Sequence, residues 1–175
     1  INGQTYQRLS LPGGQKWGNP GYPEIPAIGK MVAIPENSTY TISYSLTDSL
    51  VLNGYSICPA PYIVEDTSGG DAYLKEEFIK NDSIYSTNQF FPVNTFDTRD
   101  GGYLRNQKIL NMSAFPFKYN PVTGQLVVYT RFEVAVQIGN PQNADINVNN
   151  GLFSRLSQST LLNFENTDQI QPPAP

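Results

Sequence analysis

The longest run of alternating apolar and polar residues lies in the second half of the chain, from Gln125 to Ile138. The even-numbered positions of this run are mostly apolar: Leu126, Val128, Thr130, Phe132, Val134, Val136 and Ile138. The odd-numbered positions include Gln125, Tyr129, Arg131, Glu133 and Gln137. Successive side chains of a β-strand point to opposite faces, so a period of two predicts a strand that is buried on one face.

A turn signal comes immediately before this strand, at Tyr119–Gly124. Pro121 presets φ for the second turn position, and Gly124 accepts a positive φ without steric cost. A second alternating run, Lys108–Phe115, precedes the turn. We therefore expect the runs Lys108–Phe115 and Gln125–Ile138 to pair as a long hairpin.

Shorter β-rich runs divided by Gly, Pro and Asn occupy the first half of the chain. Strands are expected at Gln4–Leu11, Lys30–Ile34, Thr39–Leu46 and Ser49–Ile57. Glu65–Asn94 is expected to be a connection in which Asp71–Lys80 forms one helical turn or an irregular segment. The spacing of apolar residues in Phe153–Phe164 is compatible with a short helix, and β-structure is the alternative. Many short strands with one or two short helices predict an all-β fold, an antiparallel β-sandwich of jelly-roll character.

The length of 175 residues fits a single domain, which we expect to span residues 1–168. Residues 169–175 read QIQPPAP, a composition typical of an extended Pro-rich linker. We expect this linker to lead toward a further domain.

Composition excludes several classes of function. The net charge of −4 and the absence of a basic run argue against nucleic-acid binding, and no apolar run approaches the roughly 20 residues that cross a bilayer. The sequence contains no His, so it cannot supply the imidazole of a Cys/His dyad, a Ser/His/Asp triad or a His-ligated zinc site. We therefore expect a chain that is not itself an enzyme and uses no cofactor. Its single cysteine, Cys58, fits a small buried apolar residue.

Several short motifs follow one another in an order that resembles the propeptide of gingipain-type cysteine peptidases. They are Tyr22-Pro23-Glu24-Ile25-Pro26, Met31–Pro35, Ile57-Cys58-Pro59-Ala60, Leu104-Arg105, Pro116, Tyr119-Asn120-Pro121-Val122-Thr123 with the strand after it, and Leu162-Asn163-Phe164-Glu165. The resemblance spans nearly the whole chain. It implies a β-sandwich prodomain that assists the folding of a cysteine peptidase and plugs its active site.

The resemblance also implies a partner and a location. The partner would be the catalytic domain of the cognate cysteine peptidase, which would follow the linker at residues 169–175 in a precursor that is a cysteine endopeptidase. Such a protein would be bacterial and secreted or held at the cell surface, and periplasmic in transit.

In the family that the chain resembles, a basic residue shortly after the Leu-Arg pair enters the specificity pocket of the peptidase. The same spacing in this chain points to Lys108, with Arg105 and Arg99 as further candidates. The chain departs from the family pattern because Ile109 follows Lys108 where a Gly is common. The alternative is that Lys108 is a solvated charge at the start of a strand.

Two other hypotheses come from different features. Trp17 and the 11 Tyr could stack on sugars, which would make the chain an adhesion or glycan-binding module of the cell surface. Asp97 and Asp100, next to Gly101 and Gly102, form a weak candidate for a calcium loop, although their spacing does not match an EF-hand.

Overall fold

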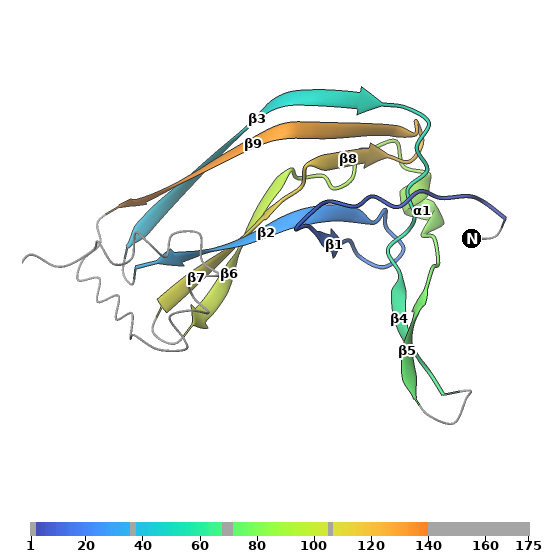
Figure 1. The fold of residues 1–175 in the computed structure, drawn as a ribbon, viewed down its shortest axis with the longest axis horizontal. Coiled ribbons are helices and arrows are strands. Elements are labelled where there is room, and N and C mark those ends of the chain that lie inside the picture. The colour runs from blue at the N-terminus through green and yellow to red at the C-terminus, as the bar shows by residue number, and fades with distance from the viewer. Residues whose placement is uncertain (1–2, 36–37, 68–71, 105–106, 140–175) are drawn as a thin grey trace, which may run out of the picture. The chain divides into compact units, whose positions relative to one another are not determined.

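The structure, a computed structural model, describes residues 3–35, 38–67, 72–104 and 107–139. Nearly all regular structure in these residues is β (Figure 1). The elements are β1 (Gln15–Trp17), β2 (Ile25–Ile34), β3 (Thr39–Leu52), β4 (Tyr62–Asp66), β5 (Tyr73–Glu77), α1 (Asp82–Tyr85), β6 (Phe96–Leu104), β7 (Gln107–Ala114), β8 (Phe117–Asn120) and β9 (Gln125–Gly139).

The strands form three sheets. A four-stranded sheet has the order β1-β2-β7-β6, a three-stranded sheet has the order β3-β9-β8, and β4 pairs with β5 alone. The pairs β1–β2, β4–β5, β6–β7 and β8–β9 are antiparallel, and the arrows of β3 and β9 point in opposite directions in Figure 1. No helix among the described residues has the length and apolar character to cross a bilayer.

The chain divides into two compact units, and each has its own apolar core. The first unit comprises residues 1–28, 47–95 and 115–131. Its core joins Ile25 of β2 to Tyr119 of β8 and Leu126 of β9, with Ile57 completely buried among them. Side chains from both larger sheets therefore pack face to face, which is the arrangement of a β-sandwich.

The second unit comprises residues 29–46, 96–114 and 132–175, of which the structure describes those up to 139. Its core is built from Val32 and Ile34 of β2 with Leu110 and Met112 of β7. Ile42, Phe96, Val136 and Ile138 pack against this core. Here too the two larger sheets meet through alternate side chains, as the period-two pattern of β9 predicts.

These observations confirm the expected all-β antiparallel sandwich, and within the described residues α1 is the one short helix. Asn81 caps it: the Asn81 side-chain oxygen accepts a hydrogen bond from the backbone N–H of Ile84 at 3.3 Å. The turn before β9 is also confirmed, with φ of +66° at Gly124. The jelly-roll connectivity stays a prediction. The linker at residues 169–175, the domain boundary at 168 and the helix at 153–164 lie outside the described residues.

The expected long hairpin is wrong. The run Lys108–Phe115 corresponds to β7, which pairs with β6, whereas β9 pairs with the short strand β8 and with β3. Pro116 separates β7 from β8 and has no N–H to give to a sheet. The chain leaves one sheet at this point and enters the other.

Three further expectations need correction. The run Ser49–Ile57 is not a separate strand, because β3 continues without a break to Leu52. The N-terminal run Gln4–Leu11 makes only an isolated bridge, between Gln7 and Ile57. Within Asp71–Lys80 the described residues contain the strand β5 rather than a helical turn.

Truncation of Leu126 should destabilise the first unit. Leu126 is 2% exposed, so Leu126→Ala removes buried methyl groups and leaves a cavity, with an expected loss of about 2–5 kcal/mol in the free energy of unfolding. Urea unfolding followed by circular dichroism measures this loss. As a control, Leu50→Ala on β3 changes a residue that is 56% exposed and should alter stability by no more than about 0.5 kcal/mol. Equal effects of the two substitutions would contradict the core assignment.

Candidate functional site

The hairpin formed by β6 and β7 carries the basic residues that the sequence indicates. Its register runs from the pair Phe96 and Ala114 to the pair Leu104 and Gln107. The register shifts between Asp100 and Tyr103, because Asp100 lies opposite Leu110 and Tyr103 lies opposite Lys108. An extra residue in one strand is a β-bulge, which bends the strand and re-aims the side chains beyond it.

Two glycines make this bulge possible. Gly102 has φ of +71°, a left-handed conformation that residues with a Cβ rarely adopt. A Cβ at Gly101 would lie 3.0 Å from the side chains of Asn111 and Ile109. The Asp100 side chain accepts a hydrogen bond from the Gly102 N–H at 2.8 Å, which fixes the bulge further.

Of the three basic candidates, two lie among the described residues. Arg99 is highly exposed on β6, and its Nε donates a hydrogen bond to Asp97 at 3.0 Å. Lys108, the second residue of β7, has a half-buried side chain, and its Nζ lies 3.9 Å from an Asp100 oxygen. Arg105 lies outside the described residues. Arg99 and Tyr103, which lie on either side of the bulge, are both exposed, so this hairpin offers a surface to a partner.

The calcium candidates Asp97 and Asp100 use their carboxylates on neighbouring groups. Asp97 accepts from Arg99, and Asp100 accepts from the backbone of the bulge and faces Lys108. Within the part of the chain that the structure describes, no three His, Cys, Asp or Glu residues gather in a way that could hold a metal ion. The calcium loop therefore has no support from the geometry of these two side chains.

The aromatic residue on which the glycan hypothesis depends is partly used in packing. Trp17 ends β1 and packs edge-on against Phe115, with ring centroids 4.5 Å apart. Tyr44 on β3 stacks with Phe132 of β9 in the same way that cross-strand partners do. Cys58 is buried, and burial raises the pKa of its thiol, so it is a packing residue as expected.

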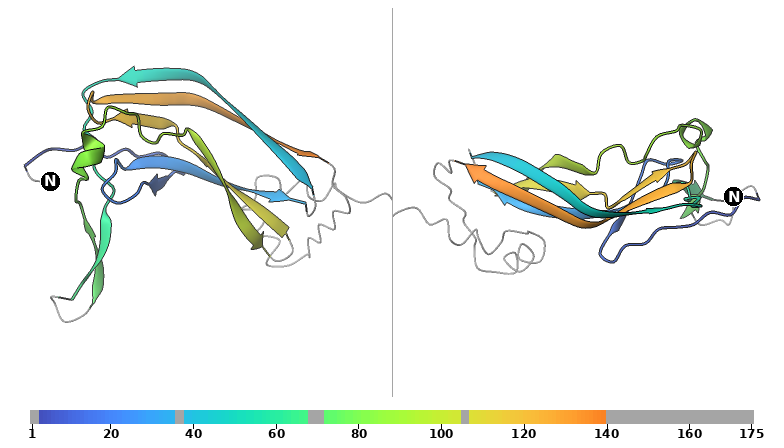
Figure 2. Two further views of the ribbon diagram at one scale, coloured as in Figure 1. Left: turned by 180° about the vertical axis from the view of Figure 1, so that it is seen from behind. Right: turned by 90° about the horizontal axis from the view of Figure 1, so that it is seen from above.

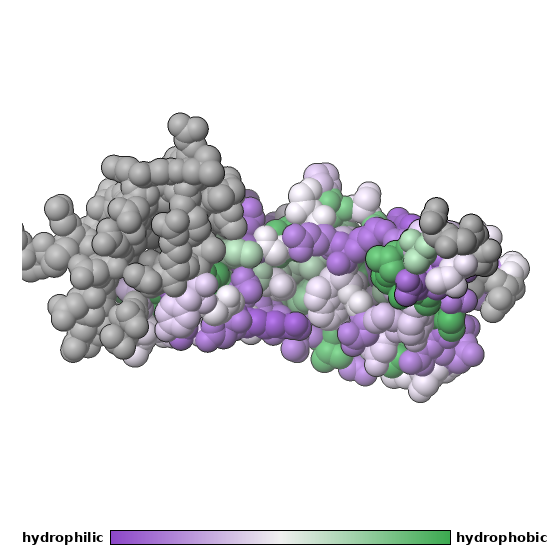
Figure 3. Space-filling model, turned by 90° about the horizontal axis from the view of Figure 1, so that it is seen from below, coloured by the Kyte–Doolittle hydropathy of each residue, from purple (hydrophilic) through white to green (hydrophobic). Residues whose placement is uncertain are grey.

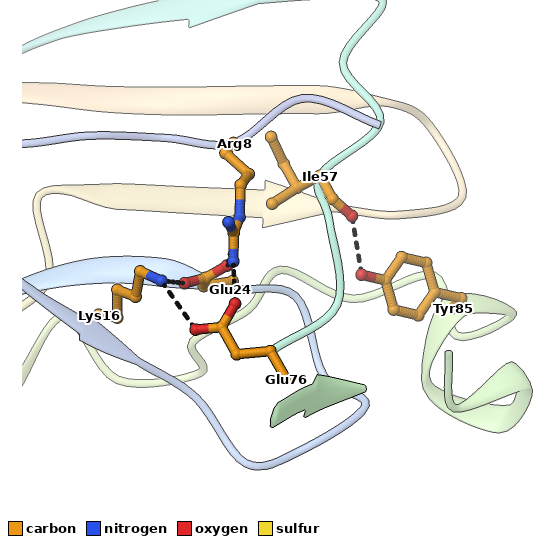
Figure 4. Close-up of polar contacts among 6 residues, drawn as sticks. All are labelled: Arg8, Lys16, Glu24, Ile57, Glu76 and Tyr85. Atoms are coloured by element: carbon orange, nitrogen blue, oxygen red, sulfur yellow. Dashed lines mark hydrogen bonds and ion pairs between the residues drawn. The ribbon is translucent and has the colours of Figure 1, made fainter. Parts of the chain in front are cut away.

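A cluster of four charged residues lies in the first unit, and the sequence did not indicate it (Figure 4). Glu24, just before β2, has a buried carboxylate that lies 3.2 Å from Arg8 and 3.6 Å from Lys16 of β1. Glu76 of β5 lies 3.3 Å from each of the same two cations. A buried carboxylate is costly unless it is paired, and here two cations pair with it.

This charge cluster joins Glu76 of β5 to three charged residues among the first 24 of the chain. Arg8 also lies over the Phe78 ring, 4.9 Å from its centroid, which adds a cation–π contact at the end of β5. The neighbouring polar contact in Figure 4 is the hydrogen bond from the Tyr85 hydroxyl to the Ile57 carbonyl, 2.8 Å long. Burial raises the pKa of that Tyr85 hydroxyl. The only signal of this cluster in the sequence is Glu24 itself, which stands between Pro23 and Ile25, where a buried charge needs a partner.

Comparison with known proteins places the chain among propeptides. A family model described as Propeptide_C25 matches residues 1–170. Lys-gingipain of Porphyromonas gingivalis is 28% identical over 136 residues, which cover 77% of this chain and 8% of Lys-gingipain. Lys-gingipain W83 of the same species matches with the same identity and coverage. The chain thus spans a small fraction of the length of these relatives.

Two solved structures share the fold. One, described as structural insight into zymogenic latency of gingipain K from Porphyromonas gingivalis, has a TM-score of 0.66 at 25% identity and covers 80% of this chain and 78% of its own. The other is the complex of Porphyromonas gingivalis RgpB pro- and mature domains, with a TM-score of 0.69 at 21% identity. The match covers 89% of this chain and 79% of the chain in that structure. Both agree with the antiparallel β-structure described above.

The bulge in the β6–β7 hairpin should depend on Gly102. Gly102→Ala places a Cβ in a left-handed conformation at a cost of about 1–2 kcal/mol, so the bulge should shift or open. Hydrogen exchange of the amides in β6 and β7 should become faster. Gly102→Asn is the matched control, since Asn tolerates this conformation better than Ala. Unchanged exchange in the Ala variant would contradict the role of the bulge.

The charge cluster should make stability sensitive to acid. Hydrogen bonds from Lys16 first, and then from Arg8, lower the pKa of Glu76 below its ordinary value, although desolvation opposes them. The unfolded chain therefore binds this proton more readily, so the Glu76 contribution to stability is present above the ordinary Glu pKa and is lost as pH falls through the folded value. Thermal unfolding from pH 6 to pH 3 should show a smaller loss for Glu76→Gln than for the natural chain. An identical pH profile would contradict this assignment.

Proposed function

Because the chain belongs to the family described as Propeptide_C25, we propose that it is the prodomain of a gingipain-type cysteine peptidase, assists the folding of that enzyme and holds it inactive. The match over residues 1–170 is the observation that carries the proposal. The fold agrees, since the structure concerned with the zymogenic latency of gingipain K is similar along most of both chains. The absence of His fits a chain that inhibits rather than catalyses.

The inhibitory element of this proposal is the β6–β7 hairpin. An inhibitor of a peptidase specific for basic residues needs an exposed cation on a supported backbone, because a rigid element loses little conformational entropy when it binds. The hairpin provides such a support: Leu110 and Met112 anchor β7 in the core of its unit, and the bulge at Gly101 and Gly102 turns the end of the hairpin.

Lys108 is the first candidate for the residue that enters the specificity pocket. A buried carboxylate in such a pocket would form a charge-assisted hydrogen bond with the Lys108 ammonium. One contact that Lys108 would give up is the surface ion pair with Asp100 at 3.9 Å, which contributes at most about 1 kcal/mol. The loss of this ion pair is a small cost beside a charge-assisted hydrogen bond in the pocket.

Arg99 and Arg105 are the alternatives for the same role. Arg99 would leave its hydrogen bond with Asp97, and its side chain is more exposed than that of Lys108. Arg105 belongs in sequence to the segment between β6 and β7. Both residues would suit a peptidase with a preference for Arg, whose planar guanidinium binds a carboxylate through two hydrogen bonds.

The rest of the proposal concerns the precursor. Its catalytic domain would follow this chain and would supply the cysteine and histidine that a peptidase of this type needs. The protein would be secreted or located at the cell surface, and would pass through the periplasm. The prodomain would keep the peptidase inactive during transit and would be removed afterwards.

Lys108→Ala should weaken inhibition of the catalytic domain of the same precursor. Loss of an anchor that fills a pocket costs about 2 kcal/mol or more, so the inhibition constant should rise roughly 30-fold. Titration of peptidase activity with the isolated chain measures this constant. Lys30→Ala, which removes an exposed lysine from β2, is the matched control and should inhibit like the natural chain.

The remaining outcomes separate the candidates. If Lys108→Ala inhibits normally and Arg105→Ala or Arg99→Ala does not, the pocket residue is the arginine concerned. If the natural chain itself does not inhibit the peptidase at any concentration up to its solubility, the proposed function is wrong.

A further inference from the structure

The β4–β5 hairpin of the first unit stands apart from the other strands of that unit (Figures 1 and 2). Its register pairs Ile63 with Glu76 and Glu65 with Leu74, so these four side chains share one face, here called the Leu74 face. Leu74 is 73% exposed and Ile63 is 61% exposed. Figure 3 shows the molecule from below, the side toward which this hairpin extends in Figure 1. Apolar and hydrophilic surface alternate on that side.

The two faces of this hairpin differ in how their side chains are used. On the opposite face, the Lys75 ammonium and the Tyr73 hydroxyl both donate to Asp66, at 2.7 and 3.3 Å. On the Leu74 face, Glu76 is held by Arg8 and Lys16, while Leu74 and Ile63 have most of their apolar surface exposed. Ile63 and Leu74 are diagonal neighbours across the two strands, a spacing at which long side chains can reach one another.

The hairpin is fixed where it joins the unit. A two-stranded sheet alone is marginally stable in water, so its position depends on its base. Glu76 in the charge cluster and the Phe78 ring beneath Arg8 supply that support. The Leu74 face is therefore presented in a defined direction before any partner binds, which lowers the entropy cost of binding.

We propose that the Leu74 face is a second docking surface for the catalytic domain, separate from the β6–β7 hairpin. This inference rests on the proposed function, because it takes the peptidase as the partner. Ile63 and Leu74 would enter an apolar depression of the peptidase surface. Lys or Arg residues at the edge of that depression would face Glu65, an exposed acid on the same face.

Charge argues against a second copy of this chain as the partner. Arg8 and Lys16 pair with Glu76 and Lys75 pairs with Asp66, while Glu65 and Glu77 are further exposed acids of the hairpin. The whole chain has a net charge of −4, so two copies would bring like charges together. A partner with a basic rim around an apolar centre complements this surface, and like-charge contact selects against the homodimer.

A binding experiment tests the second surface directly. The full chain is titrated calorimetrically against the catalytic domain of its own precursor, in which the nucleophilic cysteine is replaced by alanine so that the chain is not cleaved. Leu74→Ser should raise the Kd about tenfold or more, as expected for an apolar anchor. Glu65→Lys should also raise the Kd, and should reduce the dependence of binding on salt.

Two controls make the result specific. Leu50→Ser changes a leucine of similar exposure on β3 and should leave the Kd unchanged. Hydrogen exchange of the natural chain should show that the amides of β4 and β5 gain protection when the catalytic domain is bound. Normal Kd values for Leu74→Ser and Glu65→Lys, or no gain in protection, would overturn the inference.

The design also separates this inference from the function on which it rests. If the natural chain binds and inhibits the peptidase while the Leu74→Ser variant does so equally well, only the second surface is wrong. If the natural chain neither binds nor inhibits, the proposed function is wrong. Self-association of the free chain that Leu74→Ser abolishes, measured by sedimentation, would assign the surface to a second copy and overturn the inference.

Discussion

Face-to-face packing of alternate side chains from two antiparallel sheets is the interaction on which the rest of this molecule depends. Strand β9 contributes to it in both units, through Leu126 and Val128 in one core and through Val136 and Ile138 in the other. Strand β2 does the same with Ile25 and then with Val32 and Ile34. Because each of these two strands places apolar side chains in both cores, a slip of one residue in either would expose those side chains, which fixes the register of its neighbours. The two hairpins that we propose for binding, β6–β7 and β4–β5, extend from parts of the molecule that this packing holds in place.

The sequence predicted the parts of the fold that local patterns encode. The alternation in Gln125–Ile138 and the turn residues Pro121 and Gly124 each act on their own neighbourhood, and the structure agrees with them. Strand partners are set by contacts between distant segments, so the pairing of β7 with β6 rather than β9 could not be predicted from spacing. Strand β5 was missed for a related reason. Its sequence, YLKEE, has neither alternation nor β-branched residues, and its support comes from Arg8 and Lys16, about 60 residues away.

Of the candidate sites, too, the sequence indicated only those that lie in recognisable local motifs. Lys108 and Arg99 were found because the order of motifs around them resembles a known family, and the structure adds that they flank a bulge that Gly101 and Gly102 permit. The charge cluster around Glu24 and the Leu74 face were not found. The charge cluster needs Glu76, which lies far in sequence from Arg8, Lys16 and Glu24, and the Leu74 face needs the pairing of β4 with β5. A buried carboxylate such as Glu24 can be suspected from its apolar neighbours, but its partners Arg8 and Lys16 become evident only from the fold.

The chemical nature of the charge cluster has a consequence for how the molecule responds to its surroundings. Its cations are Arg8 and Lys16, its anions are Glu24 and Glu76, and the whole sequence contains no histidine. Side chains of these types keep their charge across the neutral range, in which an ordinary imidazole would change its own. This chain therefore has no imidazole that could act as a switch on mild acidification. A complex that dissociates under such mild conditions must owe its sensitivity to something other than a histidine of this chain.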